Sequence, residues 1–375
     1  MTMSNGIPDD ILIMILVQLP AKILVRFKSV CRSWHTLIGD PFFIKAHLMR
    51  SEIKLNNSGH FLLMYNQYYF RQGVYTLCSP GTSAKVFVNF NFPFNDKEPE
   101  CLRVAGSCNG LLCLVTPWLY NTTNIYLWNP SIKECRTIPN PPFSHHFQRD
   151  FFYGFGFGLS SIVDDIDDYK VVKTTYINEP DKRSEVEVYS LRKNSWKSIG
   201  DAFPSRVYRV YCRPVVVNGS VHWSTVTEND TITGNVNLPI VLFDMAGEVF
   251  REIALPDSVP PKAIILGTLG RSLSFFTSLP YPSGEYEIWV MKEYGVVESW
   301  TKLYVTRSDP DMMGMMPLGI MDSGEALFQE MGGLVSYDPK SERGKIYENV
   351  GLDEHSSGYF GWTCGMSSAH WKATY

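Results

Sequence analysis

Hydrophobic positions change their spacing once along this chain, close to residue 50. Before that point they recur every three or four residues, as in amphipathic helices. From about residue 60 they come in short runs separated by Gly, Pro, Asn and Asp, as strands and turns do. The pattern predicts an α+β multidomain chain, with a small helical domain over 1–50 and an all-β domain over 51–375.

The first domain is expected to contain three short helices. Pro8 suits the first turn of a helix, with Asp9 and Asp10 at the positive end of its dipole. Pro20 ends this helix, because proline disfavours helical geometry in the residue before it. The segment 39–41, Gly-Asp-Pro, ends the third helix.

These helices carry more apolar side chains than so small a bundle can bury. In the first helix, Ile11, Ile15 and Leu19 recur every four residues beside Leu12 and Leu16, which makes a wide apolar stripe. The excess predicts a docking surface and favours an adaptor over an enzyme. A small bundle that caps the β domain is the alternative interpretation.

The order and spacing of residues 7–43 closely resemble the F-box, including Ile7-Pro8, Leu19-Pro20 and Trp34. The resemblance implies docking onto a Skp1-type adaptor and, through it, onto a cullin and a RING protein of a ubiquitin ligase. Met14 stands where the family usually has an acidic residue, so we expect an altered adaptor affinity. The docking positions that the resemblance implies are Ile7, Pro8, Ile11, Ile15, Leu16, Leu19, Pro20, Leu24, Val30, Cys31 and Trp34.

A loose repeat runs through the β domain. Its units share an apolar strand, a strand with a large anchoring side chain, and a shorter strand, and the anchors lie roughly 45–60 residues apart, as in propeller blades. Residues 60–65 and 74–77 add strands for a further unit, so we expect a propeller of about six blades. A large twisted sandwich is the competing architecture. The anchors are Trp128, Tyr189, Phe243, Trp289 and Tyr337.

Several segments of this domain together resemble the F-box-associated domain of plants, especially the S-locus F-box and S-locus F-box-like group. This resemblance implies capture of a protein target for ubiquitination, and for the S-locus group a basic S-RNase in pollen self-incompatibility. The segments that carry it are Gly106–Cys113, Ile125–Ser131, Tyr153–Phe157, Asp168–Val172, Val186–Leu191 and Asn218–Trp223.

The charge argues against nucleic acid as the main partner, because the formal net charge is −4. Residues 1–50 hold six Lys/Arg and three Asp/Glu, a balance of +3, which leaves −7 on the remaining residues. A mildly acidic receptor suits a basic target. The eight cysteines are scattered, and neither a secretory leader nor a membrane span is evident, so we expect a cytoplasmic or nuclear protein.

Candidate catalytic and metal-binding groups are weak, and we expect no catalytic residue, metal or cofactor. The acidic run 164–168 lacks the Gly and Glu of an EF-hand loop, and His145-His146 has no third ligand nearby. The glycines of 154–158 are not followed by a helix, which favours a strand over a phosphate loop. The rival function is a propeller-fold enzyme with a helical cap, which would need carboxylates around a central channel.

Four methionines lie within residues 312–316. Buried packing is the default interpretation, and an adaptable apolar contact with the protein target is the alternative, because exposed methionines repack readily. These candidate target-binding residues are Met312, Met313, Met315 and Met316.

Overall fold

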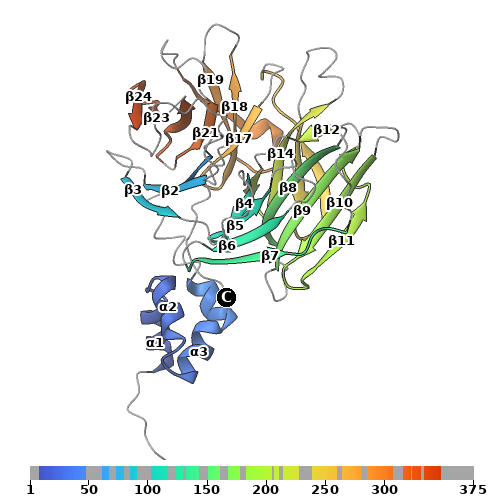
Figure 1. Cartoon of the computed structure of the whole chain (residues 1–375). Helices are drawn as coiled ribbons and strands as arrows, with labels where there is room; N and C mark the ends of the chain where they lie inside the picture. The colour runs from blue at the N-terminus through green and yellow to red at the C-terminus, as the bar shows by residue number, and fades with distance from the viewer. Residues whose placement is uncertain are drawn as a thin grey trace, which may run out of the picture.

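The computed structural model places the helices before residue 48 and the strands after residue 60 (Figure 1). The predicted domain boundary at 50/51 lies outside the described residues. The structure describes residues 8–47, 61–66, 73–79, 85–90, 103–116, 124–129, 132–142, 151–160, 168–177, 183–204, 207–210, 214–227, 239–259, 264–279, 285–306, 316–321, 323–330 and 333–347.

The helical module, which we define as residues 8–47, contains the three expected helices: α1 (Asp9–Leu16), α2 (Ala21–Phe27) and α3 (Arg32–Gly39). Residues 41–47 are also helical, which the sequence analysis missed. Asp40 caps this last helical run, since its Oδ1 accepts hydrogen bonds from the backbone N–H groups of Phe42 (2.8 Å) and Phe43 (3.3 Å). The segment 39–41 therefore ends one helix and begins another.

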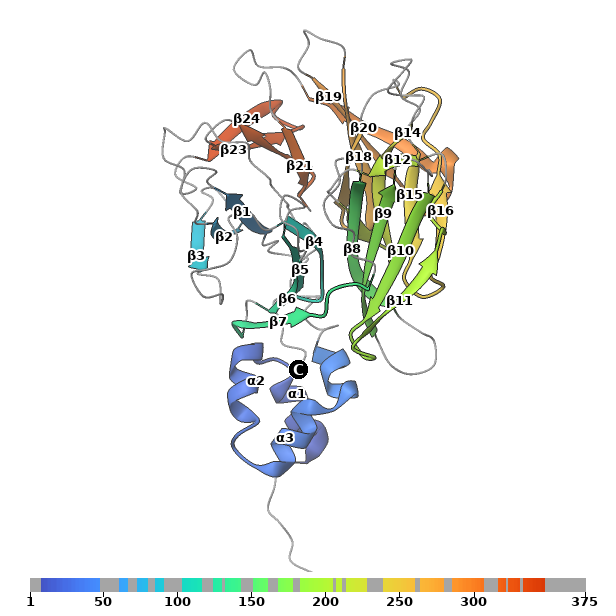
Figure 2. The same ribbon diagram turned by 45° about the vertical axis from the view of Figure 1, so that its right-hand side comes forward.

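Within its described residues the β domain contains five antiparallel sheets of at least four strands, which follow one another around the domain (Figure 2). The first blade contains β4 (Arg103–Cys108), β5 (Leu111–Val115), β6 (Ile125–Asn129) and β7 (Glu134–Ile138). The second contains β8 (Phe151–Ser160), β9 (Asp168–Ile177), β10 (Arg183–Ser190) and β11 (Ser195–Gly200). The third contains β12 (Val207–Val210), β13 (Val215–Val217), β14 (Ser220–Thr227), β15 (Ile240–Asp244) and β16 (Val249–Ile253).

The last two blades have the same strand order. The fourth contains β17 (Ile264–Leu269), β18 (Ser272–Ser278), β19 (Tyr286–Met291) and β20 (Trp300–Val305), with a 3-10 turn, η1 (Val297–Ser299), before its last strand. The fifth contains β21 (Met316–Ile320), β22 (Ala326–Glu330), β23 (Gly333–Asp338) and β24 (Arg343–Tyr347).

The propeller prediction is confirmed, but the number of blades is five rather than about six. The strands expected near residues 60–77 do form, as β1 (Phe61–Asn66) and β2 (Gly73–Ser79), and they pair with β3 (Lys85–Phe90). This sheet has only three strands among the described residues, one fewer than the smallest blade. Strand patterns alone did not show that the described residues of this unit form three strands rather than four.

The five anchors occupy the same place in every blade, the strand that pairs with the outermost strand. Each is buried; Tyr189 and Phe243, for example, are fully enclosed. Two hairpins nearer the start of a blade, at 109–110 and 218–219, are Asn-Gly turns with positive φ at both residues. The repeat predicted from the sequence therefore corresponds to one equivalent strand in each blade.

The innermost strands pack closely enough to need glycine. A Cβ on Gly106 of β4 would lie 2.9 Å from the backbone oxygen of Phe157 on β8. A Cβ on Gly156 of β8 would lie 2.5 Å from a methyl carbon of Val221 in the next blade. Strand β13 of the third blade also contacts β4 of the first, so the described inner strands meet near the centre.

Tryptophans join neighbouring blades through backbone carbonyl groups. The indole N–H of Trp196, on the outer strand of the second blade, donates to the carbonyl oxygen of Pro139 after the first blade (2.6 Å). The indole N–H of Trp300 donates in the same way to the carbonyl oxygen of Ala254 after the third blade (3.2 Å). These contacts supplement the apolar cores between the blades.

Candidate docking surface

Helix α1 displays an apolar face to solvent. Ile11, Met14 and Ile15 are 49%, 65% and 47% exposed. Their spacing of three and four residues places them side by side on the helix surface. Leu16 and Val17 point instead into the core of the helical module. The face is therefore available to a partner while the other side of α1 holds the bundle together.

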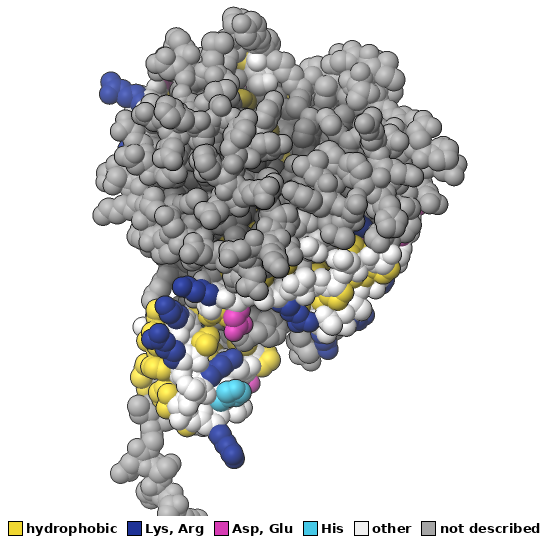
Figure 3. Space-filling view, in the orientation of Figure 1, with side chains coloured by type: hydrophobic (Ala, Val, Ile, Leu, Met, Phe, Trp, Pro, Cys, Tyr) yellow, Lys and Arg dark blue, Asp and Glu magenta, His cyan; other side chains and the backbone are white. Residues whose placement is uncertain are grey.

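Exposed apolar side chains are concentrated in the helical module. Among the described residues eight large apolar side chains are exposed, and six of them lie before residue 48. Figure 3 shows apolar side chains gathered along one edge of the module, over α1 and α2, with Lys and Arg side chains beside them. An unpartnered patch of this kind marks an interaction site. The six are Ile11, Met14, Ile15, Val25, Val30 and Phe42.

The structure separates the expected docking residues into three groups. Leu16 and Leu24 are buried in the module's own core, so they support the docking helices and have no exposed surface to offer. Leu19 and Trp34 are half-buried, and Trp34 packs against Phe27 with ring centroids 5.2 Å apart. Ile7 lies outside the described residues. The exposed members are Pro8, Ile11, Ile15, Pro20, Val30 and Cys31.

Three exposed apolar residues were not among the expected docking positions. Met14 had been noted only as a departure from the family pattern, although it completes the α1 face. The Asp40 cap starts the helical run 41–47. In this run Phe42 is 75% exposed, whereas the residue after it, Phe43, points inward. Val25 also faces solvent on α2. The Asp-Pro pair at 40–41 was the signal that could have revealed Phe42, since both residues favour a helix start.

Cys31 lies at the start of α3 and is exposed. Its Sγ lies 3.1 Å from the Ser33 hydroxyl oxygen. This hydrogen bond, with a backbone hydrogen bond from Trp34, lowers the pKa of the thiol. Cys31 is thus placed at the surface of the module, beside Val30.

The charged side chains buried in the β domain are used to join strands. Lys173 Nζ and Glu187 Oε2 are 3.0 Å apart on paired strands, and burial lowers the pKa of Lys173. Lys170 Nζ binds the carbonyl oxygen of Met245 (2.7 Å) and Glu248 Oε1 (3.0 Å), which links the second blade to the third. These buried charges therefore have structural partners on neighbouring strands or blades.

The weak candidate sites have structural roles or lie outside the description. Asp168 accepts hydrogen bonds from the Ser190 hydroxyl (2.6 Å) and the Arg192 N–H (3.0 Å), so it closes a hairpin. The described part of the chain contains no group of three potential metal ligands. The glycines of 154–158 lie in strand β8, as expected. Met316 begins β21. Outside the described residues lie His145, His146, Asp164, Met312, Met313 and Met315.

The helical module and the blades together define a small helical domain fused to a β-propeller. Residues 71–357 match the family described as F-box associated beta propeller domain, and residues 5–50 match the F-box-like family. The chain belongs to the F-box proteins that carry this propeller domain. The expected F-box and F-box-associated domains are therefore confirmed, whereas membership of the S-locus group stays a prediction.

Relatives of the same class align along most of the chain. F-box/kelch-repeat protein At3g23880 of Arabidopsis thaliana is 28% identical over 90% of this chain and 89% of its own length. The F-box protein CPR1 of Arabidopsis thaliana is 29% identical over 90% of this chain and 83% of its own. The solved structure of TolB from Acinetobacter baumannii is 11% identical to this chain and aligns with a TM-score of 0.41. The alignment covers 78% of this chain and 64% of the TolB chain, and a likeness this weak carries no functional argument.

The length and composition of a helix decide whether it could cross a membrane. Within the described residues, none of the helices has the length and apolar character needed to cross a bilayer.

Proposed function

We propose that this protein is the substrate receptor of an SCF-type ubiquitin ligase. A Skp1-type adaptor docks on the exposed face of α1 and brings a cullin and a RING protein with it, while the propeller holds a protein target. The observation that carries the proposal is that six of the eight large apolar side chains exposed in the described part of the chain lie on the module that matches the F-box. Because the family consists of substrate adaptors, no catalytic residue is required of this chain.

The mechanism is proximity. A target held by the propeller shares an assembly with the ubiquitin-charged enzyme, so its lysines meet that enzyme at a high effective concentration. The receptor then needs two binding surfaces and a rigid connection between them. The closely packed blades supply rigidity at the target end.

The proposal also includes the kind of protein that the propeller binds. The resemblance to the S-locus group and the −7 balance after residue 50 support a basic protein, and a basic S-RNase is the specific candidate. In the cytosol, an acidic receptor would attract a basic target over a distance and so speed their association. We propose that Met312, Met313, Met315 and Met316 contribute an adaptable apolar contact to it.

Affinity capture tests this function. Full-length protein recovered from its native tissue with the proteasome blocked should bring with it a Skp1-type adaptor, a cullin and at least one basic protein target. Replacement of the four methionines by Ser should keep the adaptor and reduce the recovered target. Mass spectrometry measures both. Recovery of a target without adaptor or cullin would contradict the ligase function, and unchanged target recovery from the folded Ser variant would contradict the methionine contact.

A further inference from the structure

Three serines of the chain stand three residues after an arginine and directly before an apolar residue. Serine kinases with an acidic substrate pocket select such sequences, because the pocket binds the arginine and a second, apolar pocket binds the residue after the serine. The sequence alone does not distinguish the three sites. They are Ser29 after Arg26, Ser195 after Arg192 and Ser274 after Arg271, and the apolar residues that follow are Val30, Trp196 and Phe275.

The fold closes two of the three sites. Ser274 lies within β18 and has no exposed surface. Ser195 is exposed, but the residues around it are held in place. The backbone N–H of Arg192 donates to Asp168 Oδ1 (3.0 Å), and the indole N–H of Trp196 donates to a backbone oxygen after the first blade (2.6 Å). A kinase binds its substrate as an extended segment and would have to break these contacts first.

The third site is open. Ser29 lies in the turn between α2 and α3 and is exposed, and so is Arg26 near the end of α2. Val30, the apolar residue after the serine, is 61% exposed. Two backbone hydrogen bonds of a single turn hold the segment, from the Ser29 N–H to the Arg26 carbonyl (3.2 Å) and from the Val30 N–H to the Phe27 carbonyl (3.1 Å). The three groups that such a kinase recognises are therefore all at the surface.

The surroundings of Ser29 are compatible with a phosphate. The Ser29 hydroxyl donates to the Arg26 carbonyl oxygen (2.6 Å), a local contact that the folded module can lose. Arg26 and Lys28 flank the serine on its N-terminal side, and neither forms a salt bridge with another described residue. Charge-assisted hydrogen bonds from such cations stabilise a phosphate.

A phosphate at Ser29 would change what the module can bind. It adds about −1.5 to −2 charges at neutral pH, directly before the exposed side chain of Val30. A partner that covers Val30 would also have to cover the phosphate. Taking this charge out of water is costly unless the partner offers cations of its own.

We propose that Ser29 is a phosphorylation site for an arginine-directed serine kinase and that the phosphate releases the adaptor. Ser29 Oγ attacks the γ-phosphorus of ATP, and the new O–P bond forms as the bond from that phosphorus to the β,γ-bridging oxygen breaks. ADP leaves, and the hydroxyl proton passes to a carboxylate base of the kinase. The release rests on the proposed docking function, whereas the kinase site rests on the exposure and contacts of the three serines.

Labelling of the folded full-length protein tests the site. The probe is calcium/calmodulin-dependent kinase II with ATP, and mass spectrometry measures the phosphate on each serine. Each rate is divided by that of a synthetic peptide of the same sequence, which removes the kinase's own preference. On this scale Ser29 should react at least about tenfold faster than Ser195, and Ser274 should not react. No labelling of Ser29, or labelling of Ser195 at the same relative rate, would overturn the proposal.

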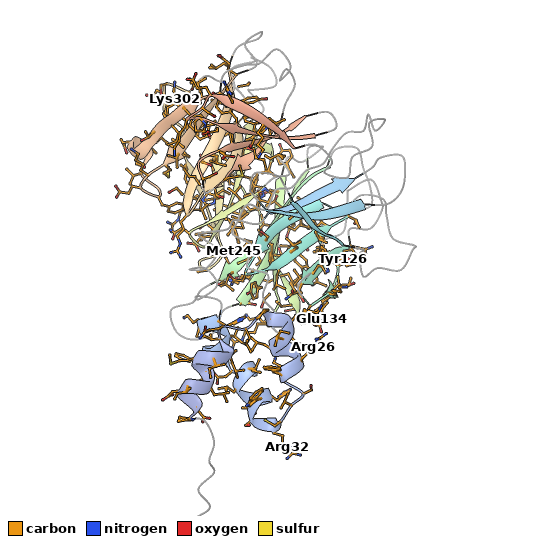
Figure 4. All side chains as sticks on the ribbon, turned by 90° about the vertical axis from the view of Figure 1, so that its left-hand side faces the viewer. Arg26, Arg32, Tyr126, Glu134, Met245 and Lys302 are labelled. Atoms are coloured by element: carbon orange, nitrogen blue, oxygen red, sulfur yellow. The ribbon has the colours of Figure 1, made fainter. Side chains whose placement is uncertain are left out.

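Two arginine variants test how the kinase recognises the site. Arg26 and Arg32 stand three residues before and three residues after Ser29, and they lie at opposite ends of the module (Figure 4). Arg26→Gln should slow the labelling of Ser29 about tenfold, whereas Arg32→Gln should slow it less than about twofold. Equal slowing would contradict recognition of Arg26 and with it the proposed site. Circular dichroism confirms the fold of both variants.

Titration with a purified Skp1-type adaptor tests the release. The phosphorylated protein should bind at least about tenfold more weakly than the unmodified protein, and Ser29→Ala treated with the kinase should keep the unmodified affinity. Equal binding of the phosphorylated and unmodified proteins would overturn the release. If the unmodified protein does not bind the adaptor, the docking function falls and the release with it, while the labelling still decides whether Ser29 is a kinase site.

Discussion

His222 shows how single polar residues are held inside this propeller. It is fully buried on β14, its Nδ1 lies 3.3 Å from the Val215 carbonyl oxygen, and its Nε2 lies 2.9 Å from the Tyr294 hydroxyl of the next blade. Burial lowers the pKa of the imidazole from 6.5 to about 4. The ring is therefore neutral in the folded protein at physiological pH.

This pKa shift predicts a loss of stability in mild acid. Below pH 6.5 the unfolded chain binds a proton that the folded protein resists until about pH 4, so the unfolding free energy falls as the pH falls through that window. The part due to His222 is about 2 kcal/mol between pH 7.5 and pH 5. Urea unfolding of the wild type and of His222→Gln at both pH values measures it. An equal loss in the two proteins would show that other groups cause the acid sensitivity.

At the scale of elements, the ends of the helices decide which side chains reach solvent. Pro8 and Pro20 were correct markers for the starts of α1 and α2, because proline restricts the backbone whatever its tertiary surroundings. Periodicity could not separate exposed from buried positions in α1, whose sequence is apolar almost all round. It therefore placed Leu16 with Ile15, although only Ile15 faces solvent.

The cap on Asp40 is expected to control the last helical run of the module. Asp40→Ala removes the acceptor for the N–H groups of Phe42 and Phe43, which should cost about 1 kcal/mol of local stability. Hydrogen exchange of peptides covering residues 41–47 should then be about fivefold faster. Asp40→Asn keeps a side-chain oxygen and serves as the control. Equal protection in all three proteins would mean that packing of Phe43, not the cap, holds the run.

On the scale of the whole molecule, the chain joins two units of different physical character. The anchors predicted the blades correctly because one buried aromatic on the same strand of each blade leaves a periodic mark in the sequence. The predicted number of blades was wrong because the described residues within 61–90 form three strands, one fewer than the smallest blade. The apolar excess of the first forty-odd residues was visible in the sequence, whereas the packing of residues 41–47 against the three helices was not, since it joins segments that are distant along the chain.

The most direct test of docking compares two variants that make the same kind of change. Ile15 on α1 and Val249 on β16 are 47% and 44% exposed, so Asp at either position should be compatible with folding. If the α1 face docks the adaptor, Ile15→Asp buries a carboxylate in the complex and should weaken binding at least about a hundredfold, while Val249→Asp should bind like the wild type. Titration calorimetry with a purified Skp1-type adaptor measures both. Equal affinities of the two variants would contradict the account.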